Sequence, residues 1–156
     1  MSLAFVFPGQ GSQAVGMQAE LAAVYPQIEA SYQEASDVLG FDLWKLTQEG
    51  PTEALGQTIN TQSAMLVAGV AVWRAWHSAG GPAPTMLSGH SLGEYTALVC
   101  AGAMSFVDGI RLVRRRGELM QNAVPAGEGA MAAVLGLDDD AIMEVCAEAS
   151  MIGVAE

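Results

Sequence analysis

The sequence has 156 residues, a length typical of one domain, and 51% of them are hydrophobic against 15% charged. This balance is typical of a globular protein and excludes a disordered chain. The net charge is −11, from 17 acidic and 6 basic residues. An acidic surface argues against nucleic-acid binding, which needs a basic footprint.

The start of the chain and its apolar runs argue against secretion and membrane insertion. The first residues lack the basic region of a signal peptide. The longest near-continuous apolar run, residues 64–73, is too short to span a bilayer. Both cysteines, Cys100 and Cys146, fall in apolar helical patterns, so we expect buried, reduced thiols. These features predict a cytoplasmic protein that binds neither membrane nor nucleic acid.

The chain opens with a short apolar run, Ala4 to Phe7, which predicts a buried strand because Pro8-Gly9 bounds it. A glycine-containing loop follows. Two helical stretches come next, split near Pro26, and the second runs to Leu39 with Gly40 as its stop.

Polar residues that can cap helices mark the middle of the chain. Asp42 and Thr52 are expected to cap short helices, and Thr61 a long one over residues 62–78. A break at Gly80-Gly81-Pro82 ends that long helix.

A second strand is predicted at Thr85 to Ser88, followed by a tight turn at Gly89 to Gly93 and a small apolar helix at Leu92 to Cys100. Ser105 then resembles the first residue of a capping box that opens a helix to about Ala123.

The pattern changes after a loop at Pro125 to Gly129, which we take as a domain boundary. Strands alternating with helices imply an α/β fold with parallel pairing. The elements predicted beyond the boundary are a strand at Met131 to Leu135, a helix capped by Asp138 or Asp139 that ends near Ser150, and a further strand starting at Ile152 to Val154.

The turn Gly89-His90-Ser91-Leu92-Gly93 fits the pattern G-x-S-x-G. It follows a predicted strand and opens a predicted helix, which is the setting of a nucleophile elbow. The helix N-terminus favours negative charge, and the backbone N–H of Leu92 is placed as an oxyanion-hole donor. A tight strand-to-helix packing explains the two glycines equally well, so the pattern leaves both interpretations open.

The loop Gly9-Gln10-Gly11-Ser12-Gln13-Ala14 fits a relaxed dinucleotide fingerprint. That interpretation needs a second strand soon afterwards, but the next stretch is helical. The loop could instead donate the backbone N–H of Gln10 to an oxyanion hole, or be a plain glycine turn.

Four of the six basic residues lie in the helix that begins at Phe106. Arg116 borders its apolar stripe, and a guanidinium there suits a substrate carboxylate. Adjacent arginines are more often a solvated face, here paired with Glu118 and nearby acids, and spacing alone favours that interpretation.

Taken together, these segments resemble the malonyl-CoA:acyl carrier protein transacylases of fatty-acid synthesis over essentially the whole chain. The similar segments are Phe5 to Gln13, Gly89 to Tyr95 with Ala97 to Gly102, Arg111 to Val113 with Arg116-Gly117 and Met120-Gln121, and Gly129 to Leu137.

The resemblance implies a role for each matching residue. Ser91 takes the acyl group, and the backbone amides of Gln10 and Leu92 form the oxyanion hole. Arg116 pairs with the free carboxylate of malonate. Gln62 lines the pocket, although Ser63 stands beside it where the family often has proline. His90 is also assigned to substrate binding.

The resemblance also implies the fold and the reaction. Residues 1–125 would form the first part of an α/β-hydrolase-like subdomain with a parallel sheet, and residues 126–156 the beginning of a small ferredoxin-like subdomain. The implied reaction is ping-pong transfer of malonyl from malonyl-CoA to the phosphopantetheine thiol of acyl carrier protein. It uses no metal and no bound cofactor.

A serine nucleophile needs a base, and the chain has two histidines, His77 and His90. His77 is expected on the surface at a helix end, and His90 adjoins Ser91 at an elbow where neighbours point apart. The family's base lies in a segment beyond residue 156, so we expect a truncated chain with weak activity on its own.

Two other functions stay open. A serine hydrolase or thioesterase could use the same elbow, although it needs a histidine after the serine, and none follows Ser91. A non-catalytic module could hold an acidic carrier protein through Arg114 and Arg115.

Overall fold

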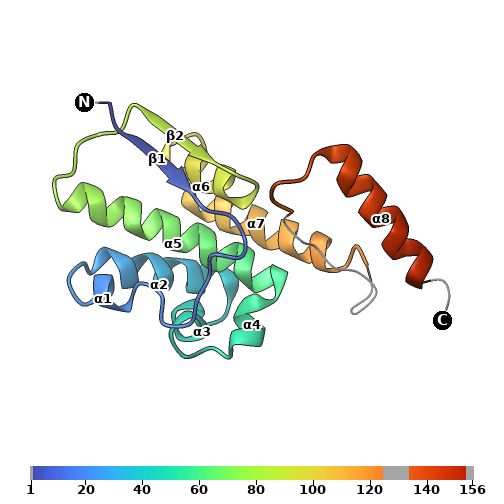
Figure 1. Cartoon of the computed structure of the whole chain (residues 1–156). Coiled ribbons are helices and arrows are strands. Elements are labelled where there is room, and N and C mark those ends of the chain that lie inside the picture. Colours follow the sequence, from blue (N-terminus) through green and yellow to red (C-terminus); the bar gives the residue numbers. More distant parts are fainter. Residues whose placement is uncertain (1, 125–133, 154–156) are drawn as a thin grey trace. The chain divides into compact units, whose positions relative to one another are not determined.

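The structure, a computed structural model, describes residues 2–124 and 134–153. The chain divides into two units, Met1–Pro125 and Ala126–Glu156. The elements in chain order are β1 (Ala4–Phe7), α1 (Ala19–Ala22), α2 (Gln27–Leu39), α3 (Leu43–Glu49), α4 (Thr52–Gly56), α5 (Thr58–Ser78), β2 (Met86–Gly89), α6 (Leu92–Cys100), α7 (Phe106–Gln121) and α8 (Asp139–Gly153) (Figure 1).

The two strands pair in parallel, with Ala4 opposite Met86, which confirms the predicted pairing. Side chains alternate across the sheet, as the two-residue period of a strand requires. Phe7 is buried against the helices, whereas Val6 is 76% exposed and Met86 70% exposed on the opposite face. The helices therefore cover one face of this small sheet.

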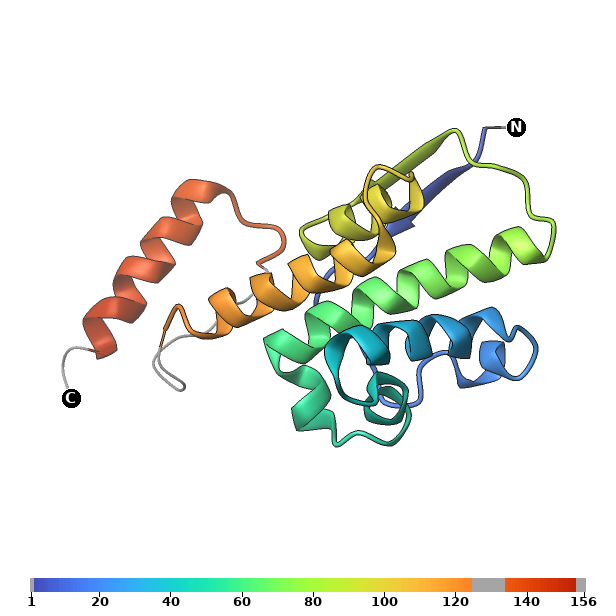
Figure 2. The ribbon, with the colours of Figure 1, turned by 180° about the vertical axis from the view of Figure 1, so that it is seen from behind.

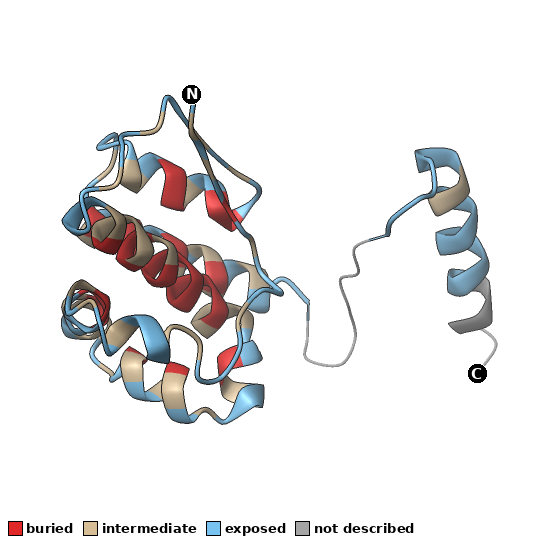
Figure 3. Ribbon diagram, turned by 60° about the vertical axis from the view of Figure 1, so that its left-hand side comes forward, coloured by how far each residue is buried: buried red, intermediate tan, exposed pale blue. Residues whose placement is uncertain are grey.

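Helix α5 is the centre of the first unit. It packs against α2, α6 and α7 (Figures 1 and 2), and every residue from Thr61 to Ala68 is buried. Figure 3 shows the buried residues concentrated along this helix. A helix surrounded in this way is apolar on all sides instead of carrying a single stripe. The neighbouring helices pack against α5, which fixes their positions.

Several predicted helix ends are confirmed by their capping geometry. Gly40 adopts a left-handed conformation, with φ 76°, at the end of α2. The Asp42 carboxylate accepts a hydrogen bond of 2.8 Å from the backbone N–H of Lys45 and opens α3. The Ser105 hydroxyl accepts one of 3.1 Å from the backbone N–H of Asp108 and opens α7.

Two predicted caps are wrong. Thr52 is the first residue of α4 and Pro51 occupies the cap position. Thr61 lies inside α5, because that helix begins one turn earlier, at Thr58. The Thr61 hydroxyl is buried and donates a hydrogen bond of 2.6 Å to the carbonyl of Leu55. A threonine hydroxyl can bond to the backbone either as a helix cap or from inside a helix, and the sequence alone does not distinguish the two.

The second unit contains α8. The Asp138 carboxylate accepts a hydrogen bond of 2.9 Å from the backbone N–H of Ala141, as expected of a cap. The helix continues through Ile152 to Gly153, so the strand predicted from Ile152 is wrong there, and residue 154 lies outside the described residues. The strand predicted at 131–135 lies mostly outside them too, and Val134 and Leu135 are not in a strand.

Both cysteines are free thiols, but their environments differ. Cys146 is exposed on α8, so the prediction of a buried thiol is wrong for it. Cys100 is half-buried at the end of α6. Burial raises the pKa of the Cys100 thiol to about 12, and the nearby charge of Arg74 acts in the opposite direction.

Helices long and apolar enough to cross a membrane are absent from the described residues.

Candidate active site

Ser91 stands at the junction of β2 and α6, as the motif predicts. It precedes the first helical residue and has φ 53° and ψ −110°. A non-glycine residue with positive φ is uncommon and costs about 1–3 kcal/mol, so the surrounding structure must hold it in place. The side chain is exposed at the helix N-terminus. Backbone strain of this kind is typical of functional sites.

The two glycines of the motif are required by close backbone packing. A Cβ at Gly89 would lie 2.1 Å from the carbonyl carbon of Gly93. A Cβ at Gly93 would lie 2.1 Å from the carbonyl oxygen of Phe7. The two glycines are therefore required for the tight strand-to-helix packing. The close contact with Phe7 also brings the end of β1 against the start of α6.

The loop after β1 lies against this turn. A Cβ at Gly9 would be 3.2 Å from the carbonyl oxygen of His90. In the part of the chain that the structure describes, neither Gln10 nor Leu92 has an acceptor for its backbone N–H. Four helices, α1 to α4, follow this loop before α5, so a second strand does not come soon after it. The dinucleotide interpretation therefore lacks the strand that it needs.

Arg116 contacts Ser91 directly. Its Nη2 donates a hydrogen bond of 2.9 Å to Ser91 Oγ, and its Nη1 donates one of 2.7 Å to Gln62 Oε1. The guanidinium carbon also lies 5.6 Å from the ring centroid of Tyr95, within cation–π distance. Gln62 is only 1% exposed. The interpretation of the arginines as a solvated face is therefore wrong at Arg116.

The neighbouring arginines have other partners. Arg115 is exposed and donates a hydrogen bond of 3.1 Å to the Glu118 carboxylate, as the solvated-face interpretation expects. Arg114 donates one of 3.0 Å to Asn60 Oδ1 and lies over the Phe41 ring at 5.5 Å. Arg114 thus joins α7 to the rest of the first unit.

Close contact between α7 and the start of α5 brings Arg116 into the site. A Cβ at Gly117 would lie 2.7 Å from the Cα of Ile59. Gln121, the last residue of α7, accepts a hydrogen bond of 3.2 Å at its Oε1 from the backbone N–H of Ile59. No sequence pattern marks this helix-capping role of Gln121, because its partner Ile59 lies 62 residues away on another helix.

The hydrogen bonds of His77 and His90 involve backbone groups of other residues and not the serine hydroxyl. The His90 carbonyl accepts a hydrogen bond of 2.9 Å from the backbone N–H of Gly93, and its side chain is exposed. His77 is exposed at the end of α5, with Nδ1 2.9 Å from the carbonyl oxygen of Trp73. Among the described residues, neither histidine is hydrogen-bonded to Ser91 Oγ. Substrate binding by His90 stays a prediction.

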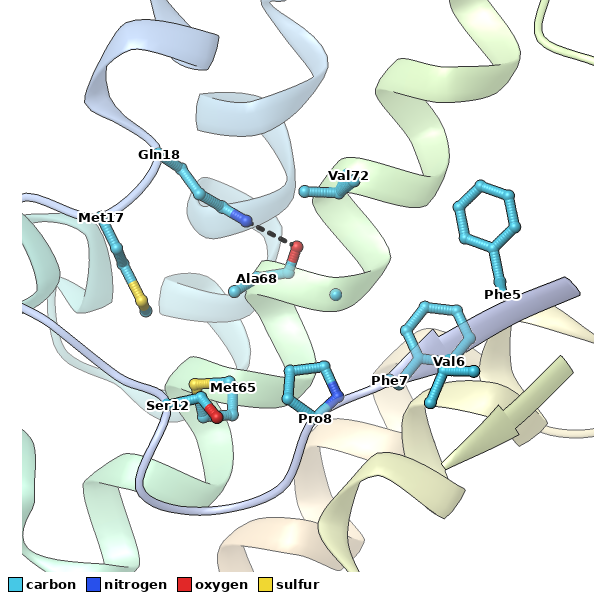
Figure 4. A pocket seen from close by; sticks show the side chains of 11 residues that line it. Phe5, Val6, Phe7, Pro8, Ser12, Met17, Gln18, Met65, Ala68 and Val72 are labelled. Atoms are coloured by element: carbon cyan, nitrogen blue, oxygen red, sulfur yellow. Dashed lines mark hydrogen bonds between the residues drawn. The ribbon is translucent and has the colours of Figure 1, made fainter. Parts of the chain in front are cut away.

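A separate pocket of about 310 Å³ lies between β1 and α5 (Figure 4). Its lining is mainly apolar and includes Met17, and on one wall the Gln18 amide donates a hydrogen bond of 2.9 Å to the carbonyl of Ala68. Neither Ser91 nor Arg116 lines this pocket, so it is not part of the candidate site. Groups of three or more metal-ligating side chains are absent from residues 2–124 and 134–153.

The chain is similar to a known family and to proteins of known structure. Residues 4–155 match the family described as acyl transferase domain. The chain is 60% identical, over 147 residues, to the malonyl CoA-acyl carrier protein transacylase of Escherichia coli (strain K12), covering 94% of this chain and 48% of that protein. The chain thus spans about half the length of the curated relatives it matches.

Two solved structures have the same fold over most of this chain. An acyl carrier protein S-malonyltransferase from Vibrio cholerae is 58% identical with a TM-score of 0.85, covering 96% of this chain and 49% of that one. The other is a complex of a type II PKS acyl-carrier protein with its malonyl-transacylase. It is 56% identical with a TM-score of 0.88, covering 95% and 48%. These neighbours support an α/β acyltransferase fold with a small parallel sheet and many helices. The chain therefore belongs to the acyl transferase domain family, which confirms the resemblance of its motifs.

Proposed function

We propose that Ser91 accepts a malonyl group from malonyl-CoA and passes it to the phosphopantetheine thiol of an acyl carrier protein, a step of fatty-acid biosynthesis. The observation that carries this proposal is the 2.9 Å hydrogen bond between Arg116 and Ser91 Oγ. It puts a carboxylate-binding cation within reach of an acyl group attached to the serine. The malonyltransferase names of the relatives support the same substrate.

In the first step, Ser91 Oγ attacks the thioester carbon of malonyl-CoA. The carbon–sulfur bond breaks, CoA leaves with a proton as its thiol, and a malonyl ester remains on the serine. The negative oxygen of the tetrahedral intermediate is stabilised by the backbone N–H groups of Gln10 and Leu92. The position of Ser91 at the N-terminus of α6 also favours this charge.

Arg116 supplies the selectivity. Its guanidinium binds the free carboxylate of the malonyl group, and Gln62 Oε1 holds the other side of the guanidinium through the 2.7 Å hydrogen bond. An acyl group without a carboxylate leaves this cation unpaired, which costs free energy once solvent is excluded. The lining residue Gln62 therefore acts through the orientation of Arg116.

In the second step, the phosphopantetheine thiol attacks the ester carbon, the carbon–oxygen bond breaks, and Ser91 Oγ takes back a proton. Both steps need a group that accepts and returns that proton. With His77 and His90 not hydrogen-bonded to Ser91 Oγ among the described residues, we propose that the base comes from outside this chain. No cofactor takes part in either step as proposed.

The finer fold assignment belongs to the same proposal. Residues 1–125 would be part of an α/β-hydrolase-like subdomain, because an elbow serine follows a strand of a parallel sheet there. Residues 126–156 would begin a small ferredoxin-like subdomain.

Transfer of malonyl from CoA to acyl carrier protein tests the proposed function. The chain is mixed with malonyl-CoA and phosphopantetheinylated acyl carrier protein, with and without imidazole as a diffusible base, and the mass of the carrier protein is followed. We expect slow malonylation of the carrier protein that imidazole accelerates and that Ser91→Ala abolishes. Equal carrier malonylation with the Ser91→Ala variant would contradict the proposal.

A further inference from the structure

The side-chain amide of Gln10 is held at both ends by helix α5. Its Nε2 donates a hydrogen bond of 3.2 Å to Thr58 Oγ1, and its Oε1 accepts one of 3.4 Å from Gln62 Nε2. Thr58 and Gln62 are four residues apart, so they share one face of the helix. These two hydrogen bonds join the loop after β1 to a helix that starts 48 residues later.

The conformation of this loop needs such an attachment. Gln10 stands between two glycines. Gly11 has φ 102°, and a Cβ added there would meet no atom within 4 Å. Glycine-flanked segments lose much conformational entropy on ordering, so hydrogen bonds must hold the backbone here. One of them is local: the backbone N–H of Gly11 donates a hydrogen bond of 2.8 Å to Gln13 Oε1. The Gln10 side chain is exposed, so burial does not hold it either. The local hydrogen bond fixes Gly11, and the hydrogen bonds of the Gln10 side chain join the loop to α5 and so help to set the direction of the Gln10 backbone N–H.

Of the two partners, Thr58 makes the shorter hydrogen bond and has fewer competing partners. Gln62 Nε2 is 3.4 Å from Gln10 Oε1, at the long end of hydrogen-bond geometry, and it also lies 3.9 Å from Met120 Sδ. Gln62 Oε1 is already used by Arg116. Within the described residues, the Thr58 hydroxyl has Gln10 as its hydrogen-bond partner.

Thr58 is itself in a fixed place, because it is the first residue of α5. The next residue, Ile59, donates its backbone N–H to Gln121 Oε1 at 3.2 Å. Gly117 of α7 packs against the Cα of Ile59 at a distance that excludes a Cβ. The same contact between α5 and α7 therefore fixes the position of Arg116 and the position of Thr58, which supports the Gln10 loop.

We propose that Thr58 is a positioning residue, whose hydroxyl holds the Gln10 side chain so that the Gln10 backbone N–H faces the acyl oxygen at Ser91. This inference rests on the proposed function, which assigns that N–H to the oxyanion hole. Thr58 touches neither the acyl group nor Ser91, and it acts through Gln10 alone. Its loss slows the chemical step and leaves the binding of malonyl-CoA unchanged.

The test compares Thr58→Val, which removes the hydroxyl at nearly constant shape, with Thr58→Ser, which keeps it. Two quantities are measured: hydrogen–deuterium exchange of residues 8–13, and the rate of Ser91 malonylation over a range of malonyl-CoA concentrations with imidazole present. For Thr58→Val we expect faster exchange and a maximal rate about three- to tenfold lower, the effect of one net hydrogen bond. The half-saturating concentration stays the same, and Thr58→Ser restores both quantities.

Two controls separate positioning from a general loss of stability. Thr52→Val changes the first residue of another helix and should alter neither quantity. In a Gln10→Ala background, Thr58→Val should cause no further loss of rate, because the contact is already gone. Unchanged exchange in Thr58→Val, an equal defect in Thr58→Ser, or a further loss in the Gln10→Ala background would overturn the proposal. If the unchanged chain shows no Ser91 malonylation, the proposed function fails, and the exchange data alone decide the Thr58 contact.

Discussion

Arg116 Nη2 donates a hydrogen bond of 2.9 Å to Ser91 Oγ, although 25 residues separate the two in the sequence. The other side of the same guanidinium is held by Gln62 at 2.7 Å. A guanidinium has five N–H donors, so a substrate carboxylate can bind those that Ser91 and Gln62 do not use. The residue proposed to bind the carboxylate and the residue proposed as the nucleophile are therefore in direct contact.

Arg116→Ala should lower the rate of Ser91 malonylation by about 10- to 100-fold, because charge-assisted hydrogen bonds contribute roughly 1.5–3 kcal/mol. Arg116→Lys keeps the charge but not the planar fork, so it should recover only part of the rate. Initial rates with malonyl-CoA and with acetyl-CoA measure both effects. The matched control is Arg115→Ala, since Arg115 is exposed and paired with Glu118. A loss as large in that control would refute a specific role for Arg116.

Ser91→Gly should be more stable than Ser91→Ala. Glycine adopts the φ of 53° found here without steric cost, whereas alanine retains the strain. After the entropy cost of glycine, the difference should be about 1 kcal/mol in the free energy of unfolding. Urea denaturation measures it. Ser78, the last residue of α5, is the control, because glycine there should be less stable than alanine. The same order at both positions would show that Ser91 is not strained.

Gly93→Ala should destabilise the first unit by about 1–3 kcal/mol, the usual effect of overpacking. The added Cβ would lie 2.1 Å from the carbonyl oxygen of Phe7, so β1 or α6 must move. Thermal unfolding followed by circular dichroism gives the change. Gly56→Ala adds a methyl group where nothing lies within 4 Å and, at the last residue of α4, should be neutral to slightly stabilising. Similar melting of the two variants would show that β1 and α6 do not pack this closely.

The two cysteines should react differently with a thiol reagent at mildly alkaline pH. Cys146 is exposed and should be labelled in the native chain. Burial raises the pKa of Cys100 to about 12, so it stays protonated and should react only after denaturation. Mass spectrometry of the labelled peptides measures both. Equal native labelling of the two thiols would contradict the burial of Cys100.

The same pKa shift has a consequence for stability. Because the folded state keeps the Cys100 proton at a pH where the unfolded chain loses it, the stabilising contribution is complete below the ordinary pKa of 9.0. It is lost as the pH rises from there toward about 12. Cys100→Ala should reduce the fall of the unfolding free energy over this range.

The parts of the fold that the sequence predicts are those set by neighbouring residues. Asp42, Ser105 and Gly40 mark helix ends because their partners lie within a turn or two. The strand before the G-x-S-x-G turn and the helix after it were also predicted. The start of α5 was predicted one turn too late, because Thr61 was taken for a helix cap. Its hydroxyl instead bonds to the Leu55 carbonyl from inside the helix.

The contacts within the site were out of reach of sequence patterns. Arg116 looks like one of three solvated arginines, and its partner Gln62 lies 54 residues away on another helix. The close packing of Gly117 on Ile59 and the hydrogen bond from Arg114 to Asn60 help to bring these helices together. The family resemblance singled out Arg116 for the malonate carboxylate, which stays a proposal, whereas periodicity favoured a solvated face.

The most direct test of the account is the intact mass of the chain after incubation with malonyl-CoA, with imidazole as the base. We expect the mass to increase by one malonyl group, and peptide mapping to find that group on Ser91. Ser91→Ala should show no increase. No gain of a malonyl group by the native chain at any imidazole concentration, or an equal gain by Ser91→Ala, would contradict the role proposed for Ser91.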